Sequence, residues 1–236
     1  MNDVLAYLDE REEEFGRHLS IARMLQARVD DVGGDAQVEV RHVNTIKSGL
    51  LIHLYNIVEA ITTRTLDTVG RTVVAERPKN WTEAIRKEWV RAEIWSGEER
   101  IGEGAVTRLA AVSGALASGE SPPAFVVKGE PGSWDDDAIK KVAMRLGCTL
   151  ALTQDVRRAA YERAYRDETT AMGYLAKRRN AIAHGVSTFE DGANDITLDE
   201  LAVLANRVIP FLRGVAESYH DFLANRSFLV PEEPVA

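Results

Sequence analysis

The residues with the most specific chemical potential lie together in the segment Leu175-Ala-Lys-Arg-Arg-Asn-Ala-Ile-Ala-His-Gly185. Arg179 carries a permanent positive charge, which can hold a phosphate group and stabilise negative charge that develops on it. His184 carries an imidazole, a group that can accept or deliver a proton. Asn180 lies four residues before His184, and the two therefore share one face of a helix. This combination of side chains indicates chemistry at a phosphate.

Arg179 also interrupts an apolar pattern with alternating spacings of three and four residues, which is typical of a helix side that packs into a core. The other positions of this pattern are Met172, Leu175, Ile182 and Val186. Because a guanidinium keeps its charge, Arg179 needs a hydrogen-bonded anion or an open cleft at such a position. On a straight helix Arg179 and His184 diverge by about 140°. They can reach one phosphate only from the rim of a groove or across two facing copies of the helix.

Glu59 is the candidate partner for Arg179. It lies one position off the apolar stripe of a long helix expected over about 38–69. A carboxylate there can pair with Arg179 and hold it in a groove. The alternative is an acid on the exposed flank of the helix, since acids are seldom buried.

Composition narrows the class of protein. The chain has 236 residues and a net charge of −8, and Cys148 is its single cysteine, which excludes an internal disulfide. The longest apolar stretch, around 50–61, is shorter than the roughly 18–20 residues that a membrane span needs. The N-terminus is acidic and amphipathic, unlike a secretory signal. We therefore expect a cytoplasmic protein that does not enter a membrane.

Charge is unevenly distributed. The segment 138–185 holds ten Lys and Arg residues against four acids, a balance of +6, which leaves −14 for the rest of the chain. Such a block is either an anion-binding surface or a helix face with internal ion pairs. The remaining histidines show no His-x-x-x-His pair, so no metal or other cofactor is expected; they are His18, His42, His53 and His220.

Helical periodicity covers almost the whole chain and predicts an all-α bundle of long antiparallel helices. Ser133 is the expected N-cap of a helix that ends at Gly147, and Thr197-Leu-Asp-Glu200 is a capping box that opens the last helix. Glycines and prolines predict an irregular insertion over about 102–132. We expect one domain over 1–228 and a loose tail over 229–236. Further helices are expected from about 5 to 32, 81 to 97, 155 to 166 and 169 to 186.

The segment Arg179-Asn180-Ala-Ile-Ala-His184 resembles the Arg-polar-x-x-x-His signature of the HEPN superfamily, the higher eukaryotes and prokaryotes nucleotide-binding domains. As in that superfamily, the signature falls on a late helix that a closing helix follows. Leu54-Tyr-Asn-Ile-Val-Glu-Ala60 and the stretch 129–147 are similar to stand-alone bacterial members. The tyrosine that some members carry shortly after the histidine is not present, because Gly185-Val186-Ser187 follows.

The resemblance implies a metal-independent endoribonuclease in which the ribose 2′-OH attacks the phosphate and leaves a 2′,3′-cyclic phosphate. His184 would transfer protons, Arg179 would hold the phosphate, Asn180 would orient His184 or a phosphate oxygen, and Glu59 would support Arg179. Two protomers would combine their residues in one groove of a homodimer. The resemblance further implies a toxin or antiviral effector, with an antitoxin as a possible partner protein. Basic residues expected to be exposed and to contact RNA are Lys177, Arg178, Arg157, Arg158 and Arg163.

Two other functions are open at this point. The same groove could bind a nucleotide, a nucleic acid or a protein without catalysis. Alternatively, Arg179 could bridge to a buried acid in a scaffold protein, since an Arg stem can lie along apolar surface and a His before a Gly is common at a helix C-terminus. Geometry discriminates between these functions, because a functional Arg179 and His184 must both reach solvent.

Overall fold

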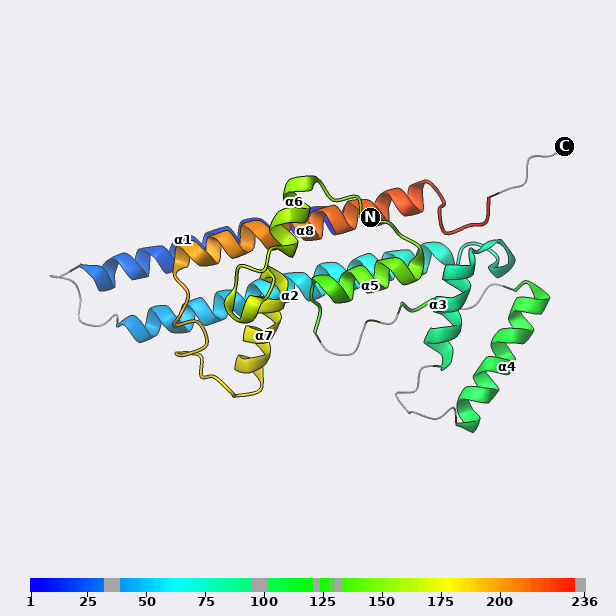
Figure 1. The fold of residues 1–236 in the computed structure, drawn as a ribbon, viewed down its shortest axis with the longest axis horizontal. Coiled ribbons are helices and arrows are strands. Elements are labelled where there is room, and N and C mark those ends of the chain that lie inside the picture. The colour runs from blue at the N-terminus through cyan, green and yellow to red at the C-terminus, as the bar shows by residue number, and fades with distance from the viewer. Residues whose placement is uncertain (32–38, 95–101, 121–123, 128, 130–132, 232–236) are drawn as a thin grey trace.

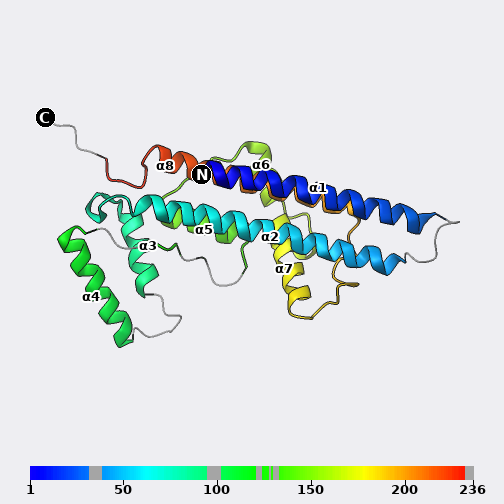
Figure 2. The ribbon, with the colours of Figure 1, turned by 180° about the vertical axis from the view of Figure 1, so that it is seen from behind.

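The computed structural model describes residues 1–31, 39–94, 102–120, 124–127, 129 and 133–231. The fold is all-α, as predicted, and no helix within these ranges is long and apolar enough to cross a membrane. Three long helices run side by side along the molecule: α1 (Asn2–Asp30), α2 (Val40–Val73) and α8 (Leu198–Ala224) (Figures 1 and 2). Their buried faces form the centre of the core, which includes Leu8, Leu54 and Phe211.

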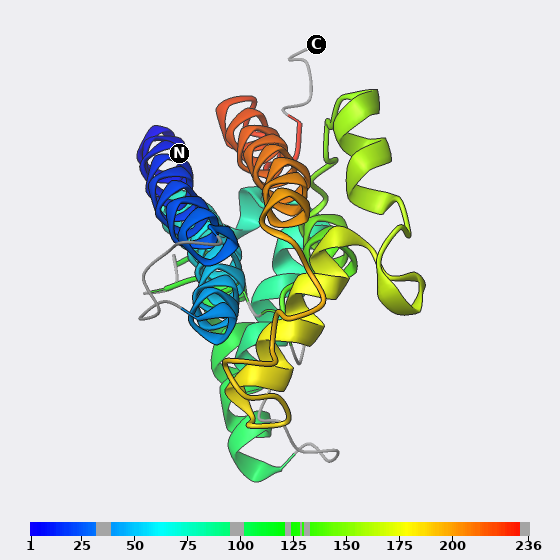
Figure 3. The ribbon, with the colours of Figure 1, turned by 90° about the vertical axis from the view of Figure 1, so that its left-hand side faces the viewer.

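The shorter helices pack around this group. At one end lie α3 (Glu83–Ile94) and α4 (Glu103–Ser118), and α5 (Asp136–Leu146) packs against α3. On the other side, α6 (Gln154–Tyr161) covers α8. The end-on view in Figure 3 shows α7 (Ala171–Ala183) leaving the long helices at a steep angle, and its packing against α2 positions the candidate site.

Local sequence signals explain several of the helix ends. Thr197 and Glu200 form the predicted capping box at the start of α8, and Gly147 ends α5 as predicted. Asp135, not the predicted Ser133, caps α5: its side chain accepts a hydrogen bond from the Ala138 N–H at 2.8 Å. Ser133 is thus free for a different role.

The expected irregular insertion over 102–132 is wrong for its first half, where α4 forms. Five alanines in Glu103–Ser118 favour a helix, and their propensity outweighs the glycine in its interior. The helix ends at Gly119, whose φ of 70° lies in the left-handed region that favours glycine. The rest of the stretch is only partly within the described residues.

Two predicted ends also differ. Helix α6 ends at Tyr161, not near 166, and a short 3-10 turn, η2 (Arg166–Glu168), lies between α6 and α7. The tail expected over 229–236 is not loose at its start, because the Val230 N–H donates to the Asn80 carbonyl at 2.8 Å and Leu229 pairs with Trp81. Residues 232–236 lie outside the described residues.

A buried ion pair connects the outer helices. The side chain of Glu88 on α3 is fully buried; one carboxylate oxygen accepts from Arg145 on α5 at 3.0 Å, and the other pairs with Arg91. Removing the acid would leave its cationic partners without their compensating charge inside the fold. Glu88 thus holds α3 against the helix that follows Ser133.

We expect Glu88→Ala to lower the free energy of unfolding by about 3 kcal/mol, since breaking a buried pair costs roughly this much. Urea denaturation followed by circular dichroism measures the change. Glu83→Ala on the same helix is the control, because its side chain is exposed. Equal effects of the two substitutions would contradict the structural role of Glu88.

Candidate functional site

Arg179 lies on α7 where this helix meets α2. Its Nη2 donates to Oε1 of Glu59 at 3.1 Å, and its guanidinium carbon lies 4.8 Å from the ring centroid of Tyr55. The Arg179 side chain is 29% exposed and that of Glu59 is 38% exposed. The predicted contact between these two residues is therefore present, and the pair lies at the edge of the protein and not inside the core.

Asn180 also contacts the guanidinium of Arg179. Its Oδ1 accepts from Nη1 of Arg179 at 3.0 Å, while its Nδ2 donates to the Ser133 hydroxyl at 2.7 Å. The Tyr55 hydroxyl in turn accepts from the backbone N–H of Trp134 at 2.9 Å. The segment before α5 is thus fastened to both α2 and α7. In this arrangement Asn180 orients Arg179, a role that differs from the expected orientation of His184.

Sequence reasoning missed Tyr55 and Ser133 as members of this group. Tyr55 lies four residues before Glu59, so the two share a face of α2, and this spacing is a signal that could have identified the tyrosine. Ser133 is distant in sequence from every other member. Nothing in its local pattern distinguishes a site residue from an N-cap.

His184 is the C-cap residue of α7, and its side chain is exposed. The N–H of Gly185 bonds the Ile182 carbonyl and the N–H of Val186 bonds the Ala181 carbonyl, which is a Schellman motif. Gly185 has a φ of 70°, a conformation that L side chains rarely adopt. The motif ends the helix at Ala183. Val186 is therefore 80% exposed and does not continue the apolar pattern, contrary to the prediction.

Neither Arg179 nor His184 is sealed in the core. Within the described residues the structure gives the His184 side chain no hydrogen-bond partner, whereas Arg179 has contacts from α2 and from Asn180. The two groups could act on an external ligand.

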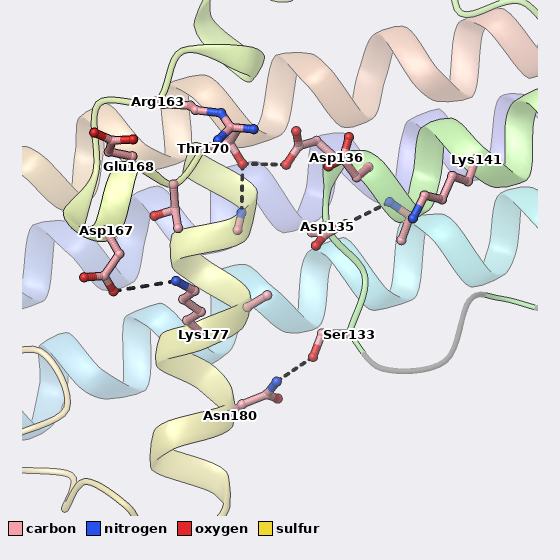
Figure 4. A pocket seen from close by; sticks show the side chains of 15 residues that line it. Ser133, Asp135, Asp136, Lys141, Arg163, Asp167, Glu168, Thr170, Lys177 and Asn180 are labelled. Atoms are coloured by element: carbon pink, nitrogen blue, oxygen red, sulfur yellow. Dashed lines mark hydrogen bonds and ion pairs between the residues drawn. The ribbon is translucent and has the colours of Figure 1, made fainter.

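An open groove of about 570 Å³ borders Asn180 on the side toward α5 and the start of α7 (Figure 4). Lys141, Arg163 and Lys177 contribute positive charge to its lining. Five carboxylates outnumber them: Asp135, Asp136, Asp137, Asp167 and Glu168. Arg179 and His184 do not line this groove. Its charge disfavours a polyanion, so it is not the surface on which RNA would be expected to bind.

Much of the basic block is engaged in ion pairs. Lys177 lies 3.6 Å from Asp167 and Arg158 lies 3.3 Å from Asp155. Arg178 was expected to be exposed, and this is wrong: its side chain is 17% exposed, pairs with Asp195 and stacks over Tyr174. All three residues are thus ion-paired, but only Arg158 pairs within its own helix, whereas Lys177 and Arg178 pair with acids outside α7. The alternative of a helix face with i,i+4 pairs is therefore not what the structure shows.

Arg157 and Arg163 are the exposed members of the predicted RNA-contacting set that make no ion pair among the described residues. Arg163 lines the acidic groove, whereas Arg157 lies on α6, which covers α8. The structure therefore does not gather the five basic residues around His184.

One wall of the groove is held by a hydrogen bond between the N-terminal ends of α5 and α7. Thr170, the N-cap of α7, donates its hydroxyl to Oδ1 of Asp136 at 2.5 Å and accepts from the Gly173 N–H at 3.1 Å. Asp136 is the first residue of α5 and is buried. Burial raises the pKa of the Asp136 carboxyl above its ordinary value of 3.8, while the hydrogen bond from Thr170 partly offsets the effect.

Comparison with known proteins gives one finding. A family model described as HEPN_MAE_28990-like HEPN matches residues 5–228, which is nearly the whole chain and includes every residue of the site. No curated protein and no solved structure gives a match.

We expect Glu59→Gln to change the free energy of unfolding by less than about 1 kcal/mol, because ion pairs at the protein surface contribute little. Urea denaturation measures it, with Glu88→Ala as the reference for a buried acid. A loss as large as that of Glu88→Ala would instead support a scaffold role for the Arg179–Glu59 pair.

We also expect Asp136 to make stability depend on pH. Because its pKa is raised in the folded protein, the folded state binds more protons than the unfolded state between pH 3.8 and the raised value. The free energy of unfolding of the wild type relative to Asp136→Asn should therefore fall as the pH rises through that window. Urea titrations between about pH 3 and pH 7 measure the difference. Asp137→Asn, at the exposed neighbouring position, is the control, and a difference that rises with pH would contradict the assignment.

Proposed function

The chain belongs to the HEPN_MAE_28990-like HEPN family, and on this basis we propose that it is a metal-independent endoribonuclease. The observation that carries the proposal is the placement of Arg179. The family signature puts a cation on a helix that otherwise packs into the core, and Glu59, Tyr55 and Asn180 hold that cation at the protein surface. His184 stands exposed at the end of the same helix.

The proposed reaction uses a nucleophile that RNA itself carries. The 2′-oxygen of the ribose attacks the adjacent phosphorus while His184 accepts the proton of the hydroxyl. The bond from phosphorus to the 5′-oxygen of the next nucleotide breaks, and this oxygen leaves with a proton. The products are a 2′,3′-cyclic phosphate and a 5′-hydroxyl, so the reaction consumes no water and leaves the proton count unchanged.

Arg179 would stabilise the charge on the phosphate. A guanidinium has five N–H groups, of which Arg179 uses one toward Glu59 and one toward Asn180. Three N–H groups remain to bind the phosphate oxygens. Glu59 and Asn180 fix the orientation of the group before RNA binds, which lowers the cost of organising it during the reaction.

A homodimer with a composite site follows from the proton transfers. The attacking hydroxyl needs a base and the leaving oxygen needs an acid, and two imidazoles can fill both roles at once. One chain supplies a single His184. A second protomer, facing the first across a two-fold axis, would supply the second imidazole. On one helix Arg179 and His184 point in different directions, but Arg179 of one protomer could face His184 of its partner.

RNA would approach from the C-terminal end of α7, away from the acidic groove. Arg157, which is exposed and makes no ion pair among the described residues, would add a salt-sensitive attraction for the backbone outside the reacting phosphate, whereas Arg158 and Lys177 contribute less because Asp155 and Asp167 pair with them. Such a nuclease would act in the cytoplasm as a toxin or antiviral effector, with an antitoxin protein to restrain it. Arg178 contributes less, because Asp195 neutralises it.

Two observations favour a second candidate, a binding module without catalysis. Arg179 already has an anionic partner, and the His184 ring has no hydrogen bond among the described residues that would fix its tautomer. Such a module would bind RNA through Arg179 and leave it intact. The variants His184→Ala and Arg179→Ala, described next, distinguish the two functions.

We expect His184→Ala to reduce RNA cleavage by about 100- to 10,000-fold, the range for loss of a general acid–base group. Arg179→Ala should reduce it by about 100- to 1,000-fold. Gel assays of a labelled RNA in EDTA measure the rates, and an RNA with 2′-deoxy sugars should stay uncut. The control is His220→Ala, which removes an exposed histidine on α8. Undiminished cleavage by His184→Ala would refute the nuclease assignment, and RNA binding without any cleavage by the wild type would establish the binding module.

We expect a mixture of Arg179→Ala and His184→Ala chains, refolded together, to cleave RNA faster than either variant alone. The mixed dimer keeps one Arg179 and one His184, on different protomers. It should therefore regain part of the activity, and not the wild-type rate, because one of the two imidazoles is missing. Cleavage rates at equal total protein measure the gain, and light scattering confirms the dimer. No gain from mixing would place the whole site within one protomer.

A further inference from the structure

Three side chains that can bind a metal converge between α1 and α2, on residues outside the proposed nuclease site. Glu14 and His18 are four positions apart and share a face of α1, and His53 reaches them from α2. One ligand atom from each residue lies within 4.8 Å of the ligand atoms of the other two. Within the described residues, these are three side chains of metal-binding types whose ligand atoms the fold brings close enough to share one ion.

We propose that Glu14, His18 and His53 form a Zn²⁺ site that joins α1 to α2. The Nδ1 atoms of His18 and His53 are 3.4 Å apart. Two nitrogens that are each about 2.0–2.1 Å from a tetrahedral Zn²⁺ lie about 3.3–3.4 Å from one another. The same distance is long for an N–H···N hydrogen bond, whose usual length is about 2.9–3.0 Å. The spacing therefore matches shared coordination better than direct bonding.

The charges around the group are compatible with a cation. Arg11 is the opposing charge, and its Nη1 lies 2.6 Å from Oε2 of Glu14, which is also 3.5 Å from Nε2 of His53. This ion pair restrains the carboxylate and leaves its other oxygen for the metal, as outer contacts do for many ligating carboxylates. Glu14 supplies the negative charge that offsets Arg11.

The two histidines differ in exposure. The His53 side chain is 20% exposed and lies against Glu14. His18 is exposed and gives the ion a path from solvent.

The site is separate from the proposed nuclease site but lies on the same helix. His53 precedes Glu59 by six positions, which corresponds to about 9 Å along α2 and about 120° around its axis. Zn²⁺ would therefore fasten α1 to one side of the helix whose other side holds Arg179. Three protein ligands leave one position of a tetrahedral ion for water.

The test is a titration of the metal-stripped full-length chain with Zn²⁺, followed by calorimetry. We expect one ion per chain, with a Tm that rises by about 5–10 °C at a free concentration of 100 times the Kd. Co²⁺ in place of Zn²⁺ should give the visible absorption of a four-coordinate ion. His18→Ala and His53→Gln should each weaken Zn²⁺ binding by about 100-fold or more, while His220→Ala should bind as the wild type does.

A matched pair of acids tests the third ligand. Glu14→Gln should weaken Zn²⁺ binding by about 10- to 100-fold, whereas Glu13→Gln, at the exposed neighbouring position, should not change it. Circular dichroism checks folding, and if His53→Gln fails to fold, His18→Ala decides, because that residue is exposed. Wild-type Zn²⁺ affinity in His18→Ala, or no Zn²⁺ binding by the wild type, would overturn the proposal.

Discussion

The charge of Arg179 cannot be removed at neutral pH, and three parts of the fold are arranged around it. Glu59 on α2 supplies an anion, Tyr55 supplies an aromatic face, and Asn180 connects the guanidinium to Ser133 before α5. These contacts let α7 pack its apolar side against α2 while one position on that side stays charged. The result is a cation with a fixed orientation at the protein surface.

Helix α2 makes contacts with other helices on two of its sides. One side meets α7 through Glu59, and another meets α1 where His53 approaches His18 and Glu14. Because a helix is stiff over a few turns, a fastening on one side restrains the position of the other. A bound Zn²⁺ between α1 and α2 would therefore act on the support of Arg179 without contacting RNA.

The charge around α7 differs between the side that faces α5 and the C-terminal end of the helix. Toward α5, five carboxylates surround the groove next to Asn180, and the basic residues there are outnumbered. Toward the C-terminus of α7, His184 is exposed beyond a Schellman motif that ends the helix. A polyanion would be repelled from the first direction and can approach from the second, which agrees with the composite site that we propose for two facing protomers.

The sequence by itself determined the all-α fold, the capping box at Thr197 and the end of α5 at Gly147, because apolar spacing and helix-end residues act over a few positions. It offered Glu59 as a candidate partner of Arg179, and the packing of α2 against α7 brought the two residues into contact. The sequence also supported the HEPN resemblance that the family match then established. Tertiary structure alone decided that Ser133 bonds Asn180, that Asp195 neutralises Arg178, and that His18 meets His53. Each of these contacts joins residues far apart in the chain, and such distances are set only when helices pack.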